Sequence, residues 1–507
     1  MQMAKVSVAV EAMHRAGLPF ISVLNDPTYG GVSASYAMQA DVKIALSDAR
    51  IGFAGPAVIL NTMCEADQSK FDKQCPPDFQ SAKYLLEHGQ IDTILDVTDK
   101  TKEDVQSEVE STVAGVAHVL MGGDTSSESV PEVPATDADK NQPFNYTNSR
   151  KIDRPQTQDI ISNLFSSFFE LSGDGRVSKD ICIRGGVASF NGKSCVVLGT
   201  YKGHTPKTME EANYGMASPH GYRTAMRLMK MAERFGLFVV TLVDTVGAWP
   251  TFQCEGDGQS EAIATNLTVM AGLKVPIITL MVGEGGSGGA LGIGMGNVIG
   301  MLSGGYFGVI SPEGAASILG RYKDDAEKAK QFPLDCQELA TAQCIYAYQL
   351  KDMGVVDDII WESADGENYT SFPVLRSRIH AFIEAQLTSL SAMSADEIIQ
   401  HRYQKFRALG TFTLMDEQAR AAAVEEATEK KSSPTRPAKP VVKPTLLTKH
   451  LAEEVVSGAM SRHRGLAPAS CPTTLPAVSQ IQKTDRDSNW TNAKKVLDAK
   501  GPEAMAA

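Results

Sequence analysis

Apolar and polar positions follow one another along the chain in a regular rhythm. "SCVVLGTY", "LFVVTLVD" and "VPIITLMV" are continuous apolar runs, typical of strands that are buried on both faces. The intervening segments "HGYRTAMRLMKMAERFG" and "GQSEAIATNLTVMAGLK" carry apolar residues at helical spacing. Strands and helices in this alternating order predict an α/β fold whose strands pair mainly in parallel.

The rhythm is interrupted twice, which divides the chain into four parts. One interruption, "GGDTSSESVPEVPATDADKNQP", is polar and aperiodic and is typical of a linker. The C-terminal part, with "KKSSPTRPAKPVVKPTLLTK", has too little apolar surface to fold alone, so we expect disorder with short helices near residues 451–460 and 493–497. The predicted parts are a first domain over residues 1–120, the linker over 121–153, a second domain over 154–412 and the tail over 413–507.

The chain also contains an internal repeat. "LPFISVLNDPTYGGVSASYAMQADVKIALSDARIGFAGP" (residues 18–56) parallels "VPIITLMVGEGGSGGALGIGMGNVIGMLSGGYFGVISP" (residues 275–312). Each copy has a Pro at the start of an apolar strand, a Gly-Gly pair, a small-residue helix, a second strand and an aromatic-containing strand that ends in Pro. The pattern predicts two related domains with equivalent loops.

The glycine-rich stretch of the second copy matches a dinucleotide-binding loop in one respect. Gly283, Gly285 and Gly288 have the G-x-G-x-x-G spacing. Such a loop requires an acidic residue near the end of the next strand, and "LSGGYFGVI" has none, while Glu313 comes late and follows a Pro. The first copy lacks the motif, so we disfavour this interpretation.

A nucleophile elbow is the second interpretation. Ser287 lies at the centre of a G-x-S-x-G motif, and Asp357 and His380 follow in the order that a hydrolase triad requires. The first copy has no such serine motif. We therefore expect Ser287 to be a packing residue of the loop.

The Gly-Gly pair is the feature that both copies keep, as Gly30-Gly31 and Gly288-Gly289. Glycines can simply let a helix approach a sheet closely, but two equivalent loops weaken that alternative. Consecutive N–H groups at the start of a helix lack partners and favour negative charge, which is typical of an oxyanion hole. We predict that Val at Gly288 or Gly289 cuts turnover by about 10²–10³-fold with little loss of folding.

Composition and charge exclude several classes of protein. The 507-residue chain has a formal net charge of −12, whereas a nucleic-acid-binding protein would normally present a basic face. The charge is uneven, because residues 425–507 carry about +4 and the remainder about −16. No apolar run is long enough to span a membrane, and "MQMAKVSVAVEAMHRAGLP" lacks a secretory signal pattern. The eight cysteines form no C-x-x-C pair and indicate a reducing compartment.

Several long blocks resemble a known enzyme family. "DPTYGGVSASYAM", "IGFAGPAVI" and "YLLEHGQID" resemble the carboxyltransferase β subunit of bacterial-type acetyl-CoA carboxylase. "YGMASPHGYRTAMRLMKMAERFG", "GQSEAIATNLTVMAGLKVPIITLMVGEGGSGGAL" and "FGVISPEGAASIL" resemble its α subunit, with "RPQTQDIISNLFSSFFELSGD" and "IIQHRYQKFRALG" similar to the α flanks. The resemblance covers residues 1–100 and 150–412 and indicates β-type and α-type regions joined in one chain.

The resemblance implies a crotonase/ClpP-like superhelix of ββα units in two related domains, the first of them incomplete. It implies transfer of CO2 from carboxybiotin on a carrier protein to acetyl-CoA, which gives malonyl-CoA, the first step of fatty acid synthesis. The implied catalytic residues are Gly30, Gly31, Gly288 and Gly289. The implied substrate-binding residues are Gly247, Gly285, Gly286, Lys202 and Tyr306.

The same resemblance implies the partners. They are the biotin carboxyl carrier protein, biotin carboxylase, acetyl-CoA and a second copy of this chain, with no metal and no covalently bound cofactor of its own. We expect a cytoplasmic protein, or a plastid stromal one if a transit segment precedes Met1. The basic tail is a candidate tether for a partner. Alternatives are another short acyl-CoA such as propionyl-CoA, an inactive assembly subunit, and a biotin-independent thioester hydrolase or decarboxylase.

The sequence departs from the family pattern at two loops and at its start. The loop "DTPGAYPG" is "DTVGAWPT" here, and "GHQKGR" is "GTYKGH", which keeps Lys202 and places His204 where Arg is expected. Lys202 is predicted either to meet coenzyme A phosphates or to be a solvated loop lysine. The family's zinc ribbon and "SGGAR" turn lie before the point where the resemblance begins. We expect an upstream start, a second chain that supplies them, or a degenerate β half.

Overall fold

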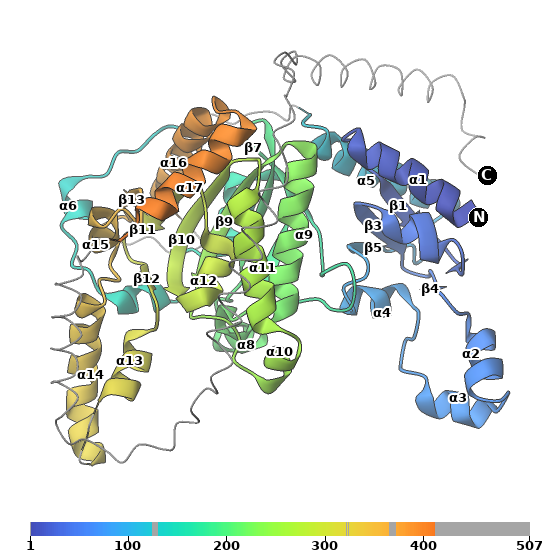
Figure 1. Cartoon of the computed structure of the whole chain (residues 1–507), viewed down its shortest axis with the longest axis horizontal. Coiled ribbons are helices and arrows are strands. Elements are labelled where there is room, and N and C mark those ends of the chain that lie inside the picture. Colours follow the sequence, from blue (N-terminus) through green and yellow to red (C-terminus); the bar gives the residue numbers. More distant parts are fainter. Residues whose placement is uncertain (1, 124–129, 321, 323, 365–371, 411–507) are drawn as a thin grey trace, which may run out of the picture. The chain divides into compact units, whose positions relative to one another are not determined.

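The computed structural model describes residues 2–123, 130–320, 322, 324–364 and 372–410 (Figure 1). Residues 1–412 cluster as one compact unit. The predictions for the tail lie outside the described residues. No helix in the described ranges is long and apolar enough to cross a membrane.

An eight-stranded sheet forms the centre of the second domain. The three apolar runs are β8, β9 and β10, and they pair in parallel as predicted. The sheet order is β13-β11-β10-β9-β8-β7-β6, with β12 also paired to β10 and with β6, β7 and β8 antiparallel. The strands are β6 (Ser166–Glu170), β7 (Ile183–Phe190), β8 (Lys193–Thr200), β9 (Phe238–Thr245), β10 (Ile277–Gly286), β11 (Val298–Leu302), β12 (Tyr306–Gly308) and β13 (Asp358–Ile360).

Helices cover both faces of this sheet, which explains why its central strands are apolar throughout. Val239 and Val243 of β9 pack in the core beneath α9 and α11, and the alternate residues Val240 and Leu242 pack in the core beneath α7 and α16. The two helices predicted from apolar spacing are therefore confirmed. The helices are α7 (Thr157–Leu164), α8 (Pro206–Glu211), α9 (Pro219–Phe235), α10 (Phe252–Gly256), α11 (Gln259–Gly272), α16 (Pro373–Ser391) and α17 (Ala395–Ala408).

The first domain has a smaller parallel sheet, in the order β1-β3-β5, and a two-stranded pair of β2 and β4. Val42 and Ile44 of β3 and Val116 of α5 share one hydrophobic core with residues of α9, so both domains contribute to it. The elements are α1 (Gln2–Arg15), β1 (Ile21–Leu24), β2 (Thr28–Tyr29), β3 (Val42–Leu46), β4 (Ile51–Gly52), α2 (Pro56–Met63), α3 (Gln68–Gln74), α4 (Ala82–Glu87), β5 (Thr93–Leu95) and α5 (Lys102–Leu120).

The structure confirms the internal repeat and extends it beyond the predicted residues. The parallel order β1-β3-β5 is equivalent to β10-β11-β13, with Ile21 opposite Val42 in one copy and Ile278 opposite Val298 in the other. The pair β2–β4 is equivalent to the pairing of the end of β10 with β12. Helices α2 to α5 of the first copy correspond, in the same order, to four helices of the second copy. These are α13 (Pro312–Leu319), α14 (Asp325–Ala342), α15 (Ala347–Asp352) and α16.

Three local expectations differ from the structure. The first copy has a short π-helix, η1 (Ser33–Ala37), with Ser35 outside helical geometry, where the second copy has a regular helix, α12 (Ser287–Gly294). The predicted glycine-rich loop is in large part strand, because β10 continues to Gly286. The predicted linker contains a short α-helix, α6 (Asp137–Lys140), and a five-residue 3-10 helix, η2 (Tyr146–Arg150).

Candidate active site

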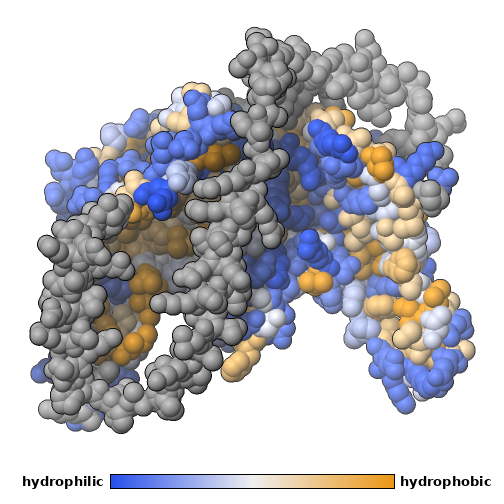
Figure 2. Space-filling view, viewed as in Figure 1, coloured by the Kyte–Doolittle hydropathy of each residue, from blue (hydrophilic) through white to orange (hydrophobic). Residues whose placement is uncertain are grey.

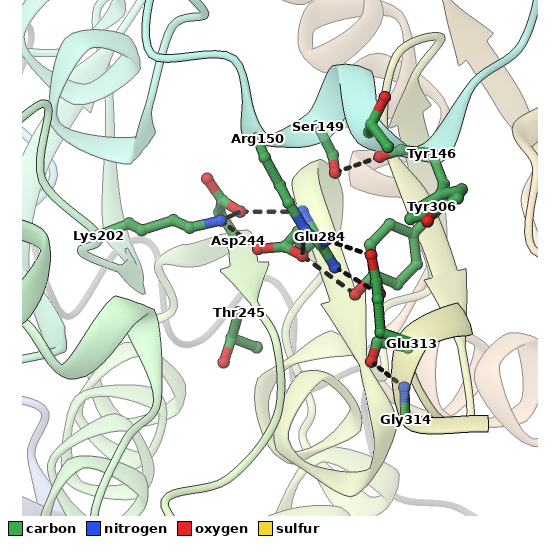
Figure 3. Close-up of polar contacts among 12 residues, drawn as sticks. Tyr146, Ser149, Arg150, Lys202, Asp244, Thr245, Glu284, Tyr306, Glu313 and Gly314 are labelled. Atoms are coloured by element: carbon green, nitrogen blue, oxygen red, sulfur yellow. Dashed lines mark hydrogen bonds and ion pairs between the residues drawn. The ribbon is translucent and has the colours of Figure 1, made fainter. Parts of the chain in front are cut away.

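Charged side chains gather where β8, β9 and β10 end (Figure 3). Lys202 follows β8, and its ammonium group donates a hydrogen bond to Glu284 Oε2 and lies 3.3 Å from Asp244 Oδ1. The backbone N–H of Glu284 donates to the same Asp244 oxygen at 2.9 Å. Because the carboxyl ends of parallel strands meet at one edge of a sheet, residues 42 and 82 positions apart in sequence are joined here.

Arg150 of η2 completes this network from the segment predicted as a linker. Its Nε donates to Glu284 Oε1 at 2.7 Å, and its two terminal nitrogens donate to both oxygens of Glu313 at 2.6 and 3.1 Å. The Tyr306 hydroxyl group also donates to Glu284 Oε1, at 3.2 Å. Glu284 is thus the acceptor for three different side chains. No sequence pattern pointed to Arg150, although an acid inside an apolar strand requires a cationic partner.

The ionisation of the network follows from its burial and its charges. Burial raises the pKa of Glu284, but the charges and hydrogen bonds of Lys202 and Arg150 outweigh it, so this pKa is lower than usual. Burial likewise lowers the pKa of Lys202, and the charges of Asp244 and Glu284 reverse the effect and raise it. Both groups therefore stay charged at neutral pH. Burial raises the pKa of the Tyr306 hydroxyl group, which stays protonated.

The environment of Lys202 corrects one expectation from the sequence. Lys202 is only 4% exposed, so its interpretation as a solvated loop lysine is wrong. Tyr306 is fully buried as well. Their contact with substrate stays a prediction, and the burial of both favours a positioning role. His204 pairs with Asp159, 2.8 Å between Nε2 and Oδ2.

The loop after β9 lies directly against the end of β10 and the start of α12. A Cβ atom on Gly286 would lie 2.0 Å from the Val246 carbonyl oxygen, and one on Gly289 would lie 2.4 Å from the Ala248 nitrogen. Both approaches are possible only without a side chain. The prediction that Val at Gly289 leaves folding nearly intact is therefore wrong. Gly285 is enclosed less tightly, since a Cβ atom there would lie 2.9 Å from Phe307 Cδ2 and 3.0 Å from the Tyr306 carbonyl oxygen.

Gly288 differs from its neighbours. A Cβ atom there would meet nothing within 4 Å, so the backbone faces open space. Gly288 and Gly289 belong to the first turn of α12, whose N-cap Gly286 supplies no side-chain hydrogen bond. Within the described residues, neither N–H group has a hydrogen-bond acceptor. Two unpaired donors at a helix start form the arrangement that binds a developing negative charge.

The equivalent loop of the first copy is built differently. The N–H group of Gly30 donates to the Phe53 carbonyl oxygen at 3.0 Å, so it is already paired. The Ser35 hydroxyl group donates to the Gly31 carbonyl oxygen at 2.5 Å. The expectation of a free pair of donors at Gly30-Gly31 is thus corrected, and Gly31 alone keeps an N–H group without an acceptor in the described part of the chain.

The nucleophile elbow fails on geometry. Ser287 is exposed beyond the carboxyl end of β10 and has a φ of 57°. His380 packs on Phe190, with ring centroids 4.9 Å apart, and Phe190 pairs with Lys193 at the amino end of β8. The serine and the histidine therefore lie at opposite ends of the sheet. Asp357, which precedes β13, pairs instead with Lys405.

The dinucleotide loop fails as well. Gly283 and Gly285 lie inside β10 and make no turn. Glu313 is held by Arg150 and is not available to a ribose. The described residues contain no group of three or more His, Cys, Asp or Glu side chains that could hold a metal ion. The seven described cysteines are free thiols.

Two solved structures share this fold. One is a transcarboxylase 12S, described as a hexamer with methylmalonyl-coenzyme A bound, with a TM-score of 0.57 and 18% identity over 82% of this chain and 70% of that one. The other is a single-chain, multi-domain long-chain acyl-CoA carboxylase, with a TM-score of 0.53 and 20% identity over 75% of this chain and 33% of that one. The chain thus has the crotonase-like fold.

The sequence comparison is more specific. Residues 139–410 match the family described as acetyl co-enzyme A carboxylase carboxyltransferase-like. The β/α carboxyl transferase chain of acetyl-CoA carboxylase from Saccharopolyspora erythraea is 36% identical over 81% of this chain and 68% of its own length. The α subunit from Stenotrophomonas maltophilia is 44% identical over 52% of this chain and 79% of its own length. The chain belongs to the carboxyltransferases of acetyl-CoA carboxylase, which are biotin-dependent enzymes, with β-type and α-type regions joined.

Proposed function

We propose that this chain transfers a carboxyl group from carboxybiotin, carried by a partner protein, to acetyl-CoA to form malonyl-CoA. The observation that carries the proposal is the pair of N–H groups at Gly288 and Gly289, which have no acceptor within the described part of the chain. The names of its relatives support acetyl-CoA as the substrate. Biotin carboxylase and the biotin carboxyl carrier protein are then the expected partners.

The chemistry requires stabilisation of negative charge on oxygen. Carboxybiotin releases CO2, its ureido nitrogen takes the α-proton of the thioester, and the resulting carbanion attacks CO2. Backbone donors at Gly288 and Gly289 would bind the oxygen on which this charge develops, and loss of one such donor slows catalysis by about 10²–10³-fold. The chain need not supply an acid or a base. This is consistent with the positions of Ser287 and His380, which lie at opposite ends of the sheet.

The ionic network positions these donors. Glu284 lies four residues before Gly288, and Lys202, Arg150 and Tyr306 hold it from three sides. Fixing the end of β10 also fixes the first turn of α12, so that the donors are already oriented when charge develops. We assign Lys202 and Tyr306 a positioning role on this basis, with Gly247, Gly285 and Gly286 as the backbone that shapes the site.

A second copy of the chain completes the proposal. Phe53 and Val309 occupy equivalent positions of the repeat and are 73% and 74% exposed. Met63 and Leu319, also equivalent, are 74% and 62% exposed. Figure 2 shows hydrophobic residues gathered over α2. Large apolar side chains at matching places on two repeats favour association of the first repeat of one copy with the second repeat of another.

The test is malonyl-CoA-dependent carboxylation of free biotin, the reverse half-reaction, by the purified chain. We expect carboxybiotin and acetyl-CoA in equal amounts, with propionyl-CoA as a poorer acceptor in the forward direction. Hydrolysis of malonyl-CoA without carboxybiotin would instead indicate a thioester hydrolase. No reaction in an oligomer of correct fold would indicate an assembly subunit.

A further inference from the structure

A cavity of about 320 Å³ lies between the first domain and α9. It has no role in the proposed carboxyl transfer. Its lining includes two carboxylates, Asp41 and Asp174, and a histidine, His14. The basic residues of the lining are Lys43, Arg176, Arg223, Arg227, Lys230 and Arg234. This excess of positive charge stands in a chain whose formal net charge is −12.

Four of the basic side chains come from one face of α9. Arg223, Arg227, Lys230 and Arg234 are spaced by four, three and four residues, which places them along one stripe of the helix. The other face of α9 is buried in the core. Like charges at this spacing repel one another, so the stripe is unfavourable unless anions face it.

Lys43 faces the same cavity from β3. It is 5% exposed, and its ammonium group has no hydrogen-bond or ion-pair partner in the described part of the chain. A Cβ atom on Gly175 would lie 3.8 Å from Lys43 Nζ and 3.3 Å from Arg227 Cδ, so the two side chains converge. The Nε of Arg227 is also buried, and no described residue supplies it with an acceptor. Buried cationic donors without partners are costly and indicate that an anion belongs there.

The carboxylates around the cavity are already engaged. Asp41 pairs with Arg234 and, at 3.5 Å, with His14. Asp174 accepts three backbone N–H groups and the His220 ring.

Two acids outside the lining are also paired, with Asp92 bound to Arg227 and Glu261 to Arg223. Asp92 accepts the backbone N–H of Lys43 at 2.8 Å, but none of these acids pairs with the ammonium group of Lys43 or of Lys230. The positive charge of the cavity is therefore only partly neutralised.

We propose that this cavity binds a small, multiply charged phosphate compound, a phosphate ester or phosphoanhydride. Guanidinium groups offer paired donors to phosphate oxygens and an ammonium group adds a point charge, which is the combination present here. The ligand would bridge Lys43 of the first domain and Arg227 and Lys230 of α9. Binding therefore stabilises the packing of the first domain on α9.

The experiment is a thermal-unfolding titration of the full chain with inorganic pyrophosphate and, separately, adenosine 3′,5′-bisphosphate. Sodium chloride at matched ionic strength is the control. We expect pyrophosphate at about 100 times its Kd to raise the Tm by a few degrees, about 3 °C, with no comparable rise in sodium chloride. A rise in Tm with adenosine 3′,5′-bisphosphate but not with pyrophosphate would support a phosphate site that recognises the base as well. No rise with either compound beyond the salt control would overturn the proposal.

Variants separate this site from general charge effects. Lys43→Met should raise the Tm without ligand, since it removes an unpartnered buried charge, and should weaken pyrophosphate binding at least tenfold. Lys230→Gln, at an exposed position of the rim, should weaken binding with little change in the unliganded Tm. Lys207→Gln, on α8 outside the cavity, and Gly288→Val should both keep the full response. A normal response in both Lys43→Met and Lys230→Gln would contradict the assignment.

Discussion

The two Gly-Gly loops of this chain share a sequence pattern and differ in what surrounds them. At Gly288-Gly289 a regular helix begins, neither N–H group has an acceptor among the described residues, and a buried ionic network holds the preceding strand. At Gly30-Gly31 a short π-helix follows, and the Gly30 N–H group is paired with Phe53. A repeated motif thus marks equivalent places in the fold, while the neighbouring contacts decide whether its donors are available.

The acid that precedes each pair shows the same difference. Glu284 and Asp26 both lie four residues before their Gly-Gly pair. Glu284 is 1% exposed and binds Lys202 and Arg150, whereas Asp26 pairs with Arg50 at the surface. A rigid, buried support beneath one loop and a solvated pair beneath the other suit a catalytic loop and a structural or accessory loop.

The largest expected effect is on stability at the buried acid. Glu284→Gln leaves the charges of Lys202 and Arg150 without their shared partner, and breaking a buried pair in this way costs about 3–5 kcal/mol. The matched variant Asp26→Asn should change the free energy of unfolding little, because its pair is solvated. Urea unfolding of both variants measures the contrast. Equal losses would show that the two supports do not differ.

A second comparison concerns neighbouring glycines of one loop. Gly289→Ala pushes a methyl group into the backbone of Gly247 and Ala248, so we expect a loss of about 1–3 kcal/mol of stability. Gly288→Ala has open space and should unfold like the unmodified chain, within about 0.5 kcal/mol. Thermal unfolding of the pair distinguishes them. A destabilised Gly288→Ala variant would mean that this backbone is enclosed.

A smaller effect is expected from pH. The folded-state pKa of Glu284 is lowered, so its stabilising contribution is fully present above its unfolded pKa of about 4.3 and is lost as pH falls through the folded value. The stability difference between the unmodified chain and Glu284→Gln should therefore be constant from pH 7 to about 5 and shrink at lower pH. Urea midpoints at these pH values test this. A difference that persists unchanged to pH 2 would contradict the lowered pKa.

Much of the fold could be predicted because it depends on local pattern. Uniform apolar runs identified β8, β9 and β10, helical spacing identified α9 and α11, and the repeated Pro and Gly-Gly positions identified the duplication. The pairing of Gly30 with Phe53 could not be predicted, since it depends on the turn that brings β2 beside β4.

The ionic part of the site was predicted only in part, for a related reason: Lys202 was named as a candidate, but its burial and the presence of Arg150 were not predicted. Arg150 lies in a polar, aperiodic segment that resembles any linker, and Lys202 follows a strand as a solvated lysine would. Arg150 and Lys202 are part of the site because they bind acids on strands that are distant from them in sequence. Asp244 and Glu284, two acids within apolar strands, were the available signal that buried cations must lie nearby.

The central claim is that the N–H groups of Gly288 and Gly289 form the working oxyanion hole. The most direct test is the kcat of Gly288→Val in malonyl-CoA-dependent carboxylation of free biotin, with Gly272→Val as a control glycine that also has open space. We predict a loss of about 10²–10³-fold for Gly288→Val, with the Tm within a few degrees of that of the unmodified chain. A folded Gly288→Val variant with near-full kcat, accompanied by loss of activity in Ser287→Ala, would contradict the claim.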